Sequence, residues 1–183
     1  IKYLKSLEAT KSIFLVTNGQ EPDMIQKLQD EDALPTQLYL STNAADYESF
    51  IKINKPKYDD SWERWNRTLD MLKDLDTRTV LRITLIRDYN DQKEMIPAFA
   101  DMFRKASPHF IEIKSYMHIG RSTNRLEHEN MLEMHEVKKF SEEIAKQSKI
   151  FSIMDESLVS RISILQNNER FIDRYIPTYA NTN

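Results

Sequence analysis

The chain of 183 residues has no cysteine, only two glycines and no apolar run long enough to span a membrane. Without cysteine, its residues can form neither disulfides nor thiolate ligands for a metal. The net charge is −3, so the chain as a whole is not a polycation. Any surface that binds nucleic acid must therefore be local. Glycine loops that cradle nucleotides are also absent, since no P-loop and no G-x-G-x-x-G occurs. The remaining composition, 40% hydrophobic and 30% charged, is typical of one soluble globular domain.

Helix-like and strand-like patterns alternate along the chain. Apolar residues at helical spacing predict helices at about 1–10, 21–29, 44–53, 60–75, from about 91 onward, and 132–147. Between them lie short strand patterns at 13–18, 36–42, 80–86 and 110–114, with a last one at 158–165. The repeated β-α order predicts an α/β fold of parallel strands with helices outside.

The predicted strands have one aliphatic face and one polar face. In Val80–Ile86 the side chains of Arg82 and Thr84 alternate with aliphatic ones, and in Phe110–Lys114 those of Glu112 and Lys114 do so. Parallel strands are usually buried on both faces and read as continuous apolar runs. A polar face therefore indicates a barrel lumen lined for a ligand, or alternatively an antiparallel sheet with one wet face.

Two lumen residues have both a functional and a structural interpretation. Arg82 could bind a carboxylate or phosphate, or it could form an ion pair with Glu112 on the neighbouring strand. Lys114 could bind an anion or form a Schiff base with a keto substrate, or it could itself pair with Glu112.

A basic region with aromatic residues follows the fourth strand. From Arg104 to Arg125 there are five basic residues and one acid. The candidates within it are Tyr116, His118, Arg121 and Arg125. Such residues suit contacts to unpaired RNA bases and phosphates, although an ordinary surface loop has a similar composition. His128 and His135 match no zinc-ligand spacing, so we expect no metal site in these residues.

Several segments resemble the wybutosine-synthesising radical S-adenosylmethionine enzymes, and among them the archaeal-type 4-demethylwyosine synthases. The similar segments occur in collinear order over about residues 10–165. They are Leu15–Gly19, Pro35–Ser41, Trp62–Arg64, Thr77–Leu85, Phe110–Ser122, Asn130–Met131 and His135–Val137.

The resemblance implies a partial β/α barrel of the radical enzyme type, related to the TIM barrel, with parallel strands and outer helices. Residues 1–165 would be its C-terminal portion and 166–183 a tail. The implied activity is that of a lyase that condenses carbons of pyruvate with N1-methylguanosine in the anticodon loop of phenylalanine tRNA. The resemblance implies S-adenosylmethionine and 4Fe-4S clusters as cofactors. It also implies that the protein is a cytoplasmic monomer that binds no membrane.

The resemblance also implies roles for individual residues. Those that would line the S-adenosylmethionine site are Asn18, Ser41, Asn43, Arg82 and Thr84. Lys114 would be the catalytic residue, and those facing the tRNA or pyruvate would be Tyr116, His118, Arg121 and Arg125. The chain departs from the family pattern at three positions. It has Asn43 where the family usually has an aspartate, and Asp88 and Ser115 where the family usually has glycines.

The cluster-binding cysteines of the family have no counterpart in this chain, and iron–sulfur clusters need thiolate ligands. We therefore expect a fragment that contributes cofactor and tRNA contacts but is inactive by itself. Two alternative functions predict different behaviour toward tRNA and S-adenosylmethionine. A non-catalytic RNA-binding module would bind tRNA without cleaving S-adenosylmethionine, and an unrelated α/β barrel enzyme for an anionic substrate would not bind tRNA.

Overall fold

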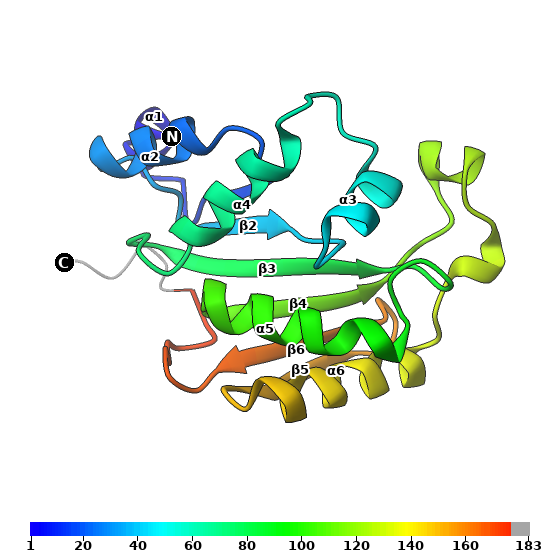
Figure 1. Cartoon of the computed structure of the whole chain (residues 1–183). Helices are drawn as coiled ribbons and strands as arrows, with labels where there is room; N and C mark the ends of the chain where they lie inside the picture. The colour runs from blue at the N-terminus through cyan, green and yellow to red at the C-terminus, as the bar shows by residue number, and fades with distance from the viewer. Residues whose placement is uncertain (177–183) are drawn as a thin grey trace.

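The structure is a computed structural model, and it describes residues 1–176. Helices and strands alternate over most of this length (Figure 1). The elements are α1 (Lys2–Lys5), β1 (Phe14–Thr17), α2 (Pro22–Asp30), β2 (Gln37–Ser41), α3 (Tyr47–Asn54), α4 (Ser61–Met71), β3 (Arg78–Leu85), η1 (Lys93–Met95), α5 (Ile96–Ala106), β4 (Phe110–Ser115), η2 (Gly120–Asn124), η3 (His128–Asn130), α6 (Met134–Ser148), β5 (Phe151–Ser157) and β6 (Ile162–Asn167). The α/β class and the order of the first four strands are confirmed.

The strands form one six-stranded sheet in the order β1-β2-β3-β4-β6-β5. From β1 to β4 every pairing is parallel, and β6 runs antiparallel to both β4 and β5. The prediction of a last strand at 158–165 is wrong in its bounds, and β5 was not predicted. Only four residues separate β5 from β6, which permits an antiparallel hairpin but no parallel crossover. Leu158 and Val159, 73% and 99% exposed, form part of that turn.

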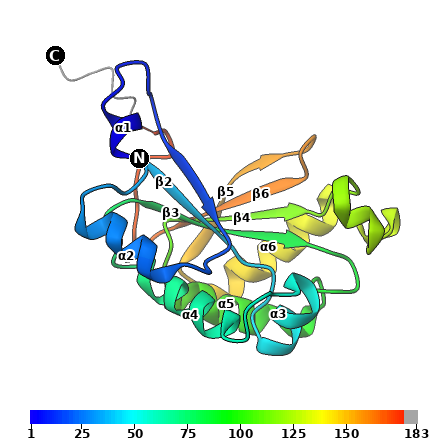
Figure 2. The same cartoon turned by 90° about the horizontal axis from the view of Figure 1, so that it is seen from above.

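Helices α2 to α6 lie on one side of the sheet (Figure 2). The aliphatic strand residues face them and form the core together with Trp65, Phe99 and Phe103. Three alternate residues of β3 belong to this core: Leu81, Ile83 and Leu85. Burying one such side chain contributes about 1.5–3 kcal/mol, so the alternation fixes which face of β3 points to the helices.

No helix among the described residues covers the other face of the sheet between β2 and β4 (Figure 2). Arg82 and Thr84 lie on this face, opposite Glu112 and Lys114 in the β3–β4 register. The prediction of one aliphatic and one polar face is therefore confirmed. We call this surface, formed by Tyr39, Arg82, Thr84, Glu112 and Lys114, the polar sheet face.

The N-terminal ends of the strands carry a small apolar cluster on the same side. It contains Tyr39, Val80 and Phe110, and Ile172 from beyond β6 packs against it. The Arg78 guanidinium donates to the backbone carbonyls of residues 173–175. The segment after β6 is thus attached to β3 through residues 173–175. The expected tail at 166–183 lies, from residue 177 on, outside the described residues.

Candidate functional site

A cavity of about 520 Å³ lies where β1 and β2 end. It is lined by Asn18, Gln20, Glu21, Ser41, Asn43, Phe50, Asn54, Lys55, Pro56, Lys57, Tyr58 and Trp65. Three of the five residues expected to line a cofactor site, Asn18, Ser41 and Asn43, are therefore side by side. Carboxyl ends of parallel strands are where α/β proteins usually bind ligands.

Gly19 allows the chain to turn into this cavity. Its φ of +74° lies in the left-handed region, and a Cβ there would be 2.7 Å from Leu40 Cδ1 and 3.1 Å from Trp65 Cδ1. Only glycine fits such a position without strain. The turn places Asn18 and Gln20 beside the ends of the neighbouring strands, where both line the cavity.

Gln20 is a cavity residue that the sequence pattern did not single out. Its Nε2 donates to the Ser61 carbonyl at 3.0 Å, which fixes the amide against the start of α4. Its Oε1 is buried and has no hydrogen-bond partner among the described residues. A buried acceptor without a partner is unfavourable by about 1–3 kcal/mol, so a ligand that donates a hydrogen bond here would be stabilised.

Asn90 holds together the ends of β2 and β3. Its side chain is fully buried, its Oδ1 accepts from Ile86 N at 2.7 Å, and its Nδ2 donates to the carbonyls of Asn43 and Thr84 at 2.9 Å each. Asn43 Oδ1 in turn accepts from Thr84 N at 3.1 Å. These bonds fix the position of Asn43 at the edge of the cavity.

Arg82 and Glu112 form an ion pair on the polar sheet face. Arg82 Nε donates to Glu112 Oε1 at 2.8 Å, and the guanidinium lies over the ring of Tyr39, 4.4 Å from its centre. Burial, and next the nearby Glu112 carboxylate, raise the pKa of the Tyr39 hydroxyl. Of the two interpretations of Arg82, the ion pair is the one that forms in the structure. Neither Arg82 nor Thr84 lines the 520 Å³ cavity.

Lys114 lies on the same face, half-buried and opposite Thr84. Its expected alternative partner, Glu112, is bound by Arg82 instead. Among the described residues, no carboxylate lies within 4 Å of the Lys114 ammonium group. The structural interpretation of Lys114 as a partner of Glu112 is therefore wrong.

The loop after β4 brings together most of the predicted RNA-facing residues. The hydroxyl of Tyr116 donates to Ser122 Oγ at 3.1 Å and lies 3.3 Å from His118 Nδ1. His118 meets His128 edge to face with the ring centres 6.1 Å apart. Tyr116 is buried against Ile53, Ile86 and Leu126, and it thus anchors a loop whose Arg121 and Arg125 are exposed.

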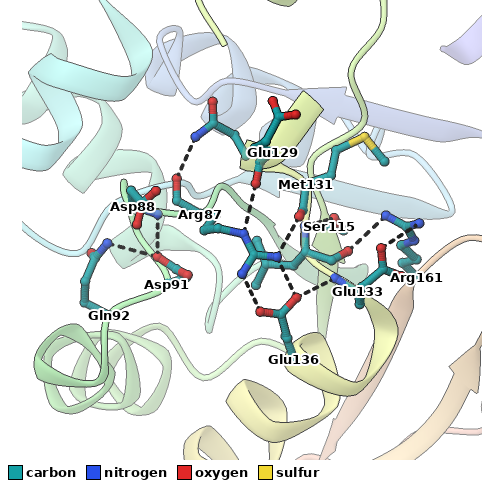
Figure 3. Close-up of polar contacts among 12 residues, drawn as sticks. Arg87, Asp88, Asp91, Gln92, Ser115, Glu129, Met131, Glu133, Glu136 and Arg161 are labelled. Carbon is teal, nitrogen blue, oxygen red and sulfur yellow. Dashed lines mark hydrogen bonds and ion pairs between the residues drawn. The ribbon is translucent and has the colours of Figure 1, made fainter. Parts of the chain in front are cut away.

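Arg87, just beyond β3, fixes the far end of this loop (Figure 3). Its guanidinium donates to the carbonyls of Glu129 and Met131 at 2.9 Å and binds both carboxylate oxygens of Glu136 at 2.5 and 2.7 Å. The hydrogen bond from Arg87 lowers the pKa of the Glu136 carboxyl. Arg161 adds a contact from the β5–β6 turn by donating to the Leu132 carbonyl at 3.1 Å. Residues 129–136 are therefore attached to the edge of the sheet at several points.

Within residues 1–176, no group of three His, Asp or Glu side chains is placed to hold a metal ion. No helix in that range is long and apolar enough to cross a membrane.

Comparisons with known proteins agree with the resemblance seen in the sequence. A family model described as wyosine base formation matches residues 105–167. An S-adenosyl-L-methionine-dependent tRNA 4-demethylwyosine synthase from Pyrococcus abyssi is 38% identical over 156 residues, which are 85% of this chain and 45% of that protein. The chain thus spans about half the length of the curated relatives it matches.

Solved structures show the same relationship in three dimensions. A structure of TYW1 with a lysine-pyruvate adduct bound superposes with a TM-score of 0.75 at 40% identity, covering 87% of this chain and 48% of that one. Coproporphyrinogen III oxidase from Escherichia coli, described as a radical SAM enzyme, matches with a TM-score of 0.53 at 12% identity, covering 86% and 35%. The latter likeness concerns the fold, and it supports a partial barrel of the radical enzyme type.

Proposed function

We infer a function from the family to which this chain belongs, the wybutosine-synthesising radical S-adenosylmethionine enzymes. We propose that it forms part of a tRNA 4-demethylwyosine synthase, a lyase that joins carbons of pyruvate to N1-methylguanosine beside the anticodon of phenylalanine tRNA. We further propose that the whole protein is a cytoplasmic monomer. The observation that carries the proposal is the collinear identity to a curated synthase over most of the chain.

The 520 Å³ cavity suits S-adenosylmethionine, which supplies radical chemistry in enzymes of this class. Asn18, Ser41 and Asn43 offer amide and hydroxyl groups, and the buried Gln20 Oε1 would accept from an amino or hydroxyl group of the cofactor. Arg82 and Thr84 lie outside this cavity, Arg82 next to Ser41 in the β2–β3 register, and in this proposal the cofactor would extend toward them. These residues bind and orient, and none of them is asked to transfer a proton.

The residues of this chain do not fit an iron–sulfur cluster, because a cluster is held by thiolates and the chain has none. The ligands of a 4Fe-4S cluster must therefore be supplied by sequence outside these 183 residues. This chain would supply the cavity for S-adenosylmethionine, a lysine that binds pyruvate, and part of the surface that contacts the tRNA.

We assign Lys114 to pyruvate. Its ammonium group is half-buried on the polar sheet face and has no carboxylate partner among the described residues, so an anionic substrate can take that place. A neutral lysine amine can also attack the keto carbon of pyruvate and form an imine as water leaves. A lysine–pyruvate adduct in the related TYW1 structure supports a lysine in this role. We assign Tyr116, His118, Arg121 and Arg125 to the tRNA.

The proposal is tested with the full-length protein after anaerobic reconstitution of its iron. It is incubated with S-adenosylmethionine, pyruvate and tRNA that carries N1-methylguanosine, and the nucleosides are analysed by mass spectrometry. We expect loss of N1-methylguanosine with appearance of 4-demethylwyosine. A cluster-loaded protein that binds tRNA but leaves the nucleoside unchanged would overturn the proposed activity.

The role of Lys114 is tested by two substitutions and a trapping reaction. We expect Lys114→Ala to abolish product, whereas Lys146→Ala, an exposed lysine on α6, should leave turnover unchanged. Borohydride reduction in the presence of labelled pyruvate, followed by peptide mapping, shows whether an imine forms at Lys114. If Lys114→Arg retains activity and no label is trapped there, the lysine acts only through its charge. Full activity of Lys114→Ala would remove it from the site.

A further inference from the structure

Five cations lie at the carboxyl end of the parallel strands without an ion-pair partner among the described residues. They are Lys52, Lys55, Lys57, Arg121 and Arg125, and we call them the basic rim. All five are exposed. Elsewhere on the surface many cations have an acidic partner, such as Lys105 with Asp70 and Arg67 with Asp23. The rim thus presents five exposed positive charges without ion-pair partners among the described residues, on a chain whose net charge is negative.

Four of the five rim residues are connected through two neighbouring cavities, although they come from two segments far apart in the sequence. Lys52, Lys55 and Arg125 line one small cavity of about 70 Å³, and Lys55 also lines the 520 Å³ cavity with Lys57. Lys55 therefore stands on the ridge between the two. Figure 1 shows α3 and the loop after β4 at the same end of the sheet, to which the arrows of β2, β3 and β4 point.

The backbone holds the lysines of the α3–α4 connection in defined places. Lys55 has a φ of +46°, a left-handed conformation in which it caps α3 by donating its backbone N–H to the Ile51 carbonyl. Pro56, which follows, has a fixed φ and separates Lys55 from Lys57. The ammonium group of Lys52 lies 4.9 Å from the centre of the Tyr89 ring. The backbone at Lys55 and the ammonium group of Lys52 are therefore held in defined places.

An aromatic residue stands next to these charges. Tyr58 follows Lys57, lines the 520 Å³ cavity and is 44% exposed, with the Arg64 guanidinium 4.9 Å from its ring centre. Asp60 is bound by Arg64, whereas Asp59 and the cavity-lining Glu21 form no ion pair among the described residues. Phosphate-binding cations beside an exposed aromatic ring are typical of surfaces that bind unpaired RNA, in which bases stack and the backbone follows a basic track.

We propose that the basic rim binds the RNA backbone on both sides of the target nucleotide, with Lys55 and Lys57 on one side and Arg121 and Arg125 on the other. The inference rests on the proposed tRNA substrate and adds a second RNA-binding segment, the α3–α4 connection, to the loop after β4. Tyr58 is placed to stack on a base next to the contacted phosphates. The 520 Å³ cavity and Lys114 lie inward of the rim.

The test measures binding of a labelled anticodon stem-loop RNA to the full-length protein by fluorescence anisotropy between 0.05 and 0.3 M salt. The variant Lys55→Asn/Lys57→Gln removes two charges, and asparagine tolerates the left-handed conformation at position 55. Its matched control is Lys149→Asn/Lys146→Gln, since Lys149 caps α6 with a φ of +65° and lies just before β5, at the other end of the sheet. A third variant, Lys52→Gln/Lys57→Gln, keeps the cap at Lys55 unchanged.

Each phosphate contact to a single strand contributes about 0.7 to the slope of log affinity against log salt. Loss of two contacts should lower the slope by about 1.4 and weaken binding at 0.1 M salt by about 25-fold, while the control binds like the parent. The inference alone is overturned if both rim variants bind like the control and Arg121→Ala/Arg125→Ala weakens binding. If the parent protein binds no RNA, the proposed function fails and the inference fails with it.

Discussion

Replacement of Asn90 by alanine should destabilise the end of the sheet beside the 520 Å³ cavity. Asn90 is fully buried and connects three backbone groups: Ile86 N, the Asn43 carbonyl and the Thr84 carbonyl. Alanine at this position offers neither the acceptor nor the two donors. All three backbone groups then lose their partner at once, at the point where β2 and β3 end.

The size of the effect follows from these contacts. A buried hydrogen-bonding group left without a partner is unfavourable by about 1–3 kcal/mol, and part of the sum is offset because the asparagine amide no longer has to be buried. We expect Asn90→Ala to lower the free energy of unfolding by about 3 kcal/mol. In a domain of 150–250 residues, this corresponds to a fall in Tm of about 6–12 °C.

A matched asparagine at the opposite end of the sheet separates stability from ligand binding. Asn167 is also fully buried, donates to Ser107 Oγ and the Pro108 carbonyl, and accepts from the backbone N–H groups of Glu169 and Arg170. Asn167→Ala should therefore lower Tm by a similar amount. Only Asn90→Ala should also weaken binding of S-adenosylhomocysteine, measured by calorimetry at a temperature where both variants are folded. A loss below about 1 kcal/mol in Asn90→Ala would refute the account of its three bonds.

Two other predictions concern the opposite end of the sheet and the loop after β4. Burial lowers the pKa of His109 to about 4, and its Nδ1 accepts from Thr79 N, so the unfolded chain binds the proton more tightly. Stability should therefore fall as pH drops from about 6.5 to about 4, by on the order of 1–2 kcal/mol after solvent screening, and His109→Asn should flatten this dependence in urea titrations. Arg87→Lys cannot reproduce two carbonyl contacts plus a bidentate pair with Glu136, so it should destabilise by about 1–2 kcal/mol and raise amide exchange over residues 129–133. Unchanged exchange there would mean that other contacts hold the loop.

Periodicity made much of the fold predictable. The alternation in Val80–Ile86 identified both the position of β3 and the face that carries Arg82 and Thr84. The hairpin was missed because its pattern is misleading: Asp155 and Glu156 lie within β5, while the apolar Leu158 and Val159 lie in the exposed turn. The alternation of apolar and polar residues predicts which residues are buried only where buried and exposed positions alternate regularly. In this edge hairpin they do not.

Contacts across strands were less predictable than the strands themselves. Arg82 and Glu112 are 30 residues apart, and their pairing depends on a register that the sequence does not state. Gln20 had no signal beyond its place after Gly19, because a single amide matches no pattern. Asn18, Ser41 and Asn43 were grouped by the family resemblance alone. In the structure they meet because each follows or ends a parallel strand, and the carboxyl ends of such strands lie at one edge.

The difference between Arg82 and Lys114 decides where an anionic substrate should bind on the polar sheet face. Glu112 is only 7% exposed, and removal of one member of a buried ion pair is unfavourable by about 3–5 kcal/mol because the other charge is left alone. A substrate carboxylate that drew Arg82 away from Glu112 would meet that penalty. Lys114, on the same face, has no carboxylate partner to lose among the described residues, so the same anion would gain a charge partner there without breaking another pair. Arg82 can still donate through its remaining N–H groups while it stays paired, which suits a residue that orients a ligand and leaves Lys114 as the group that meets the anion.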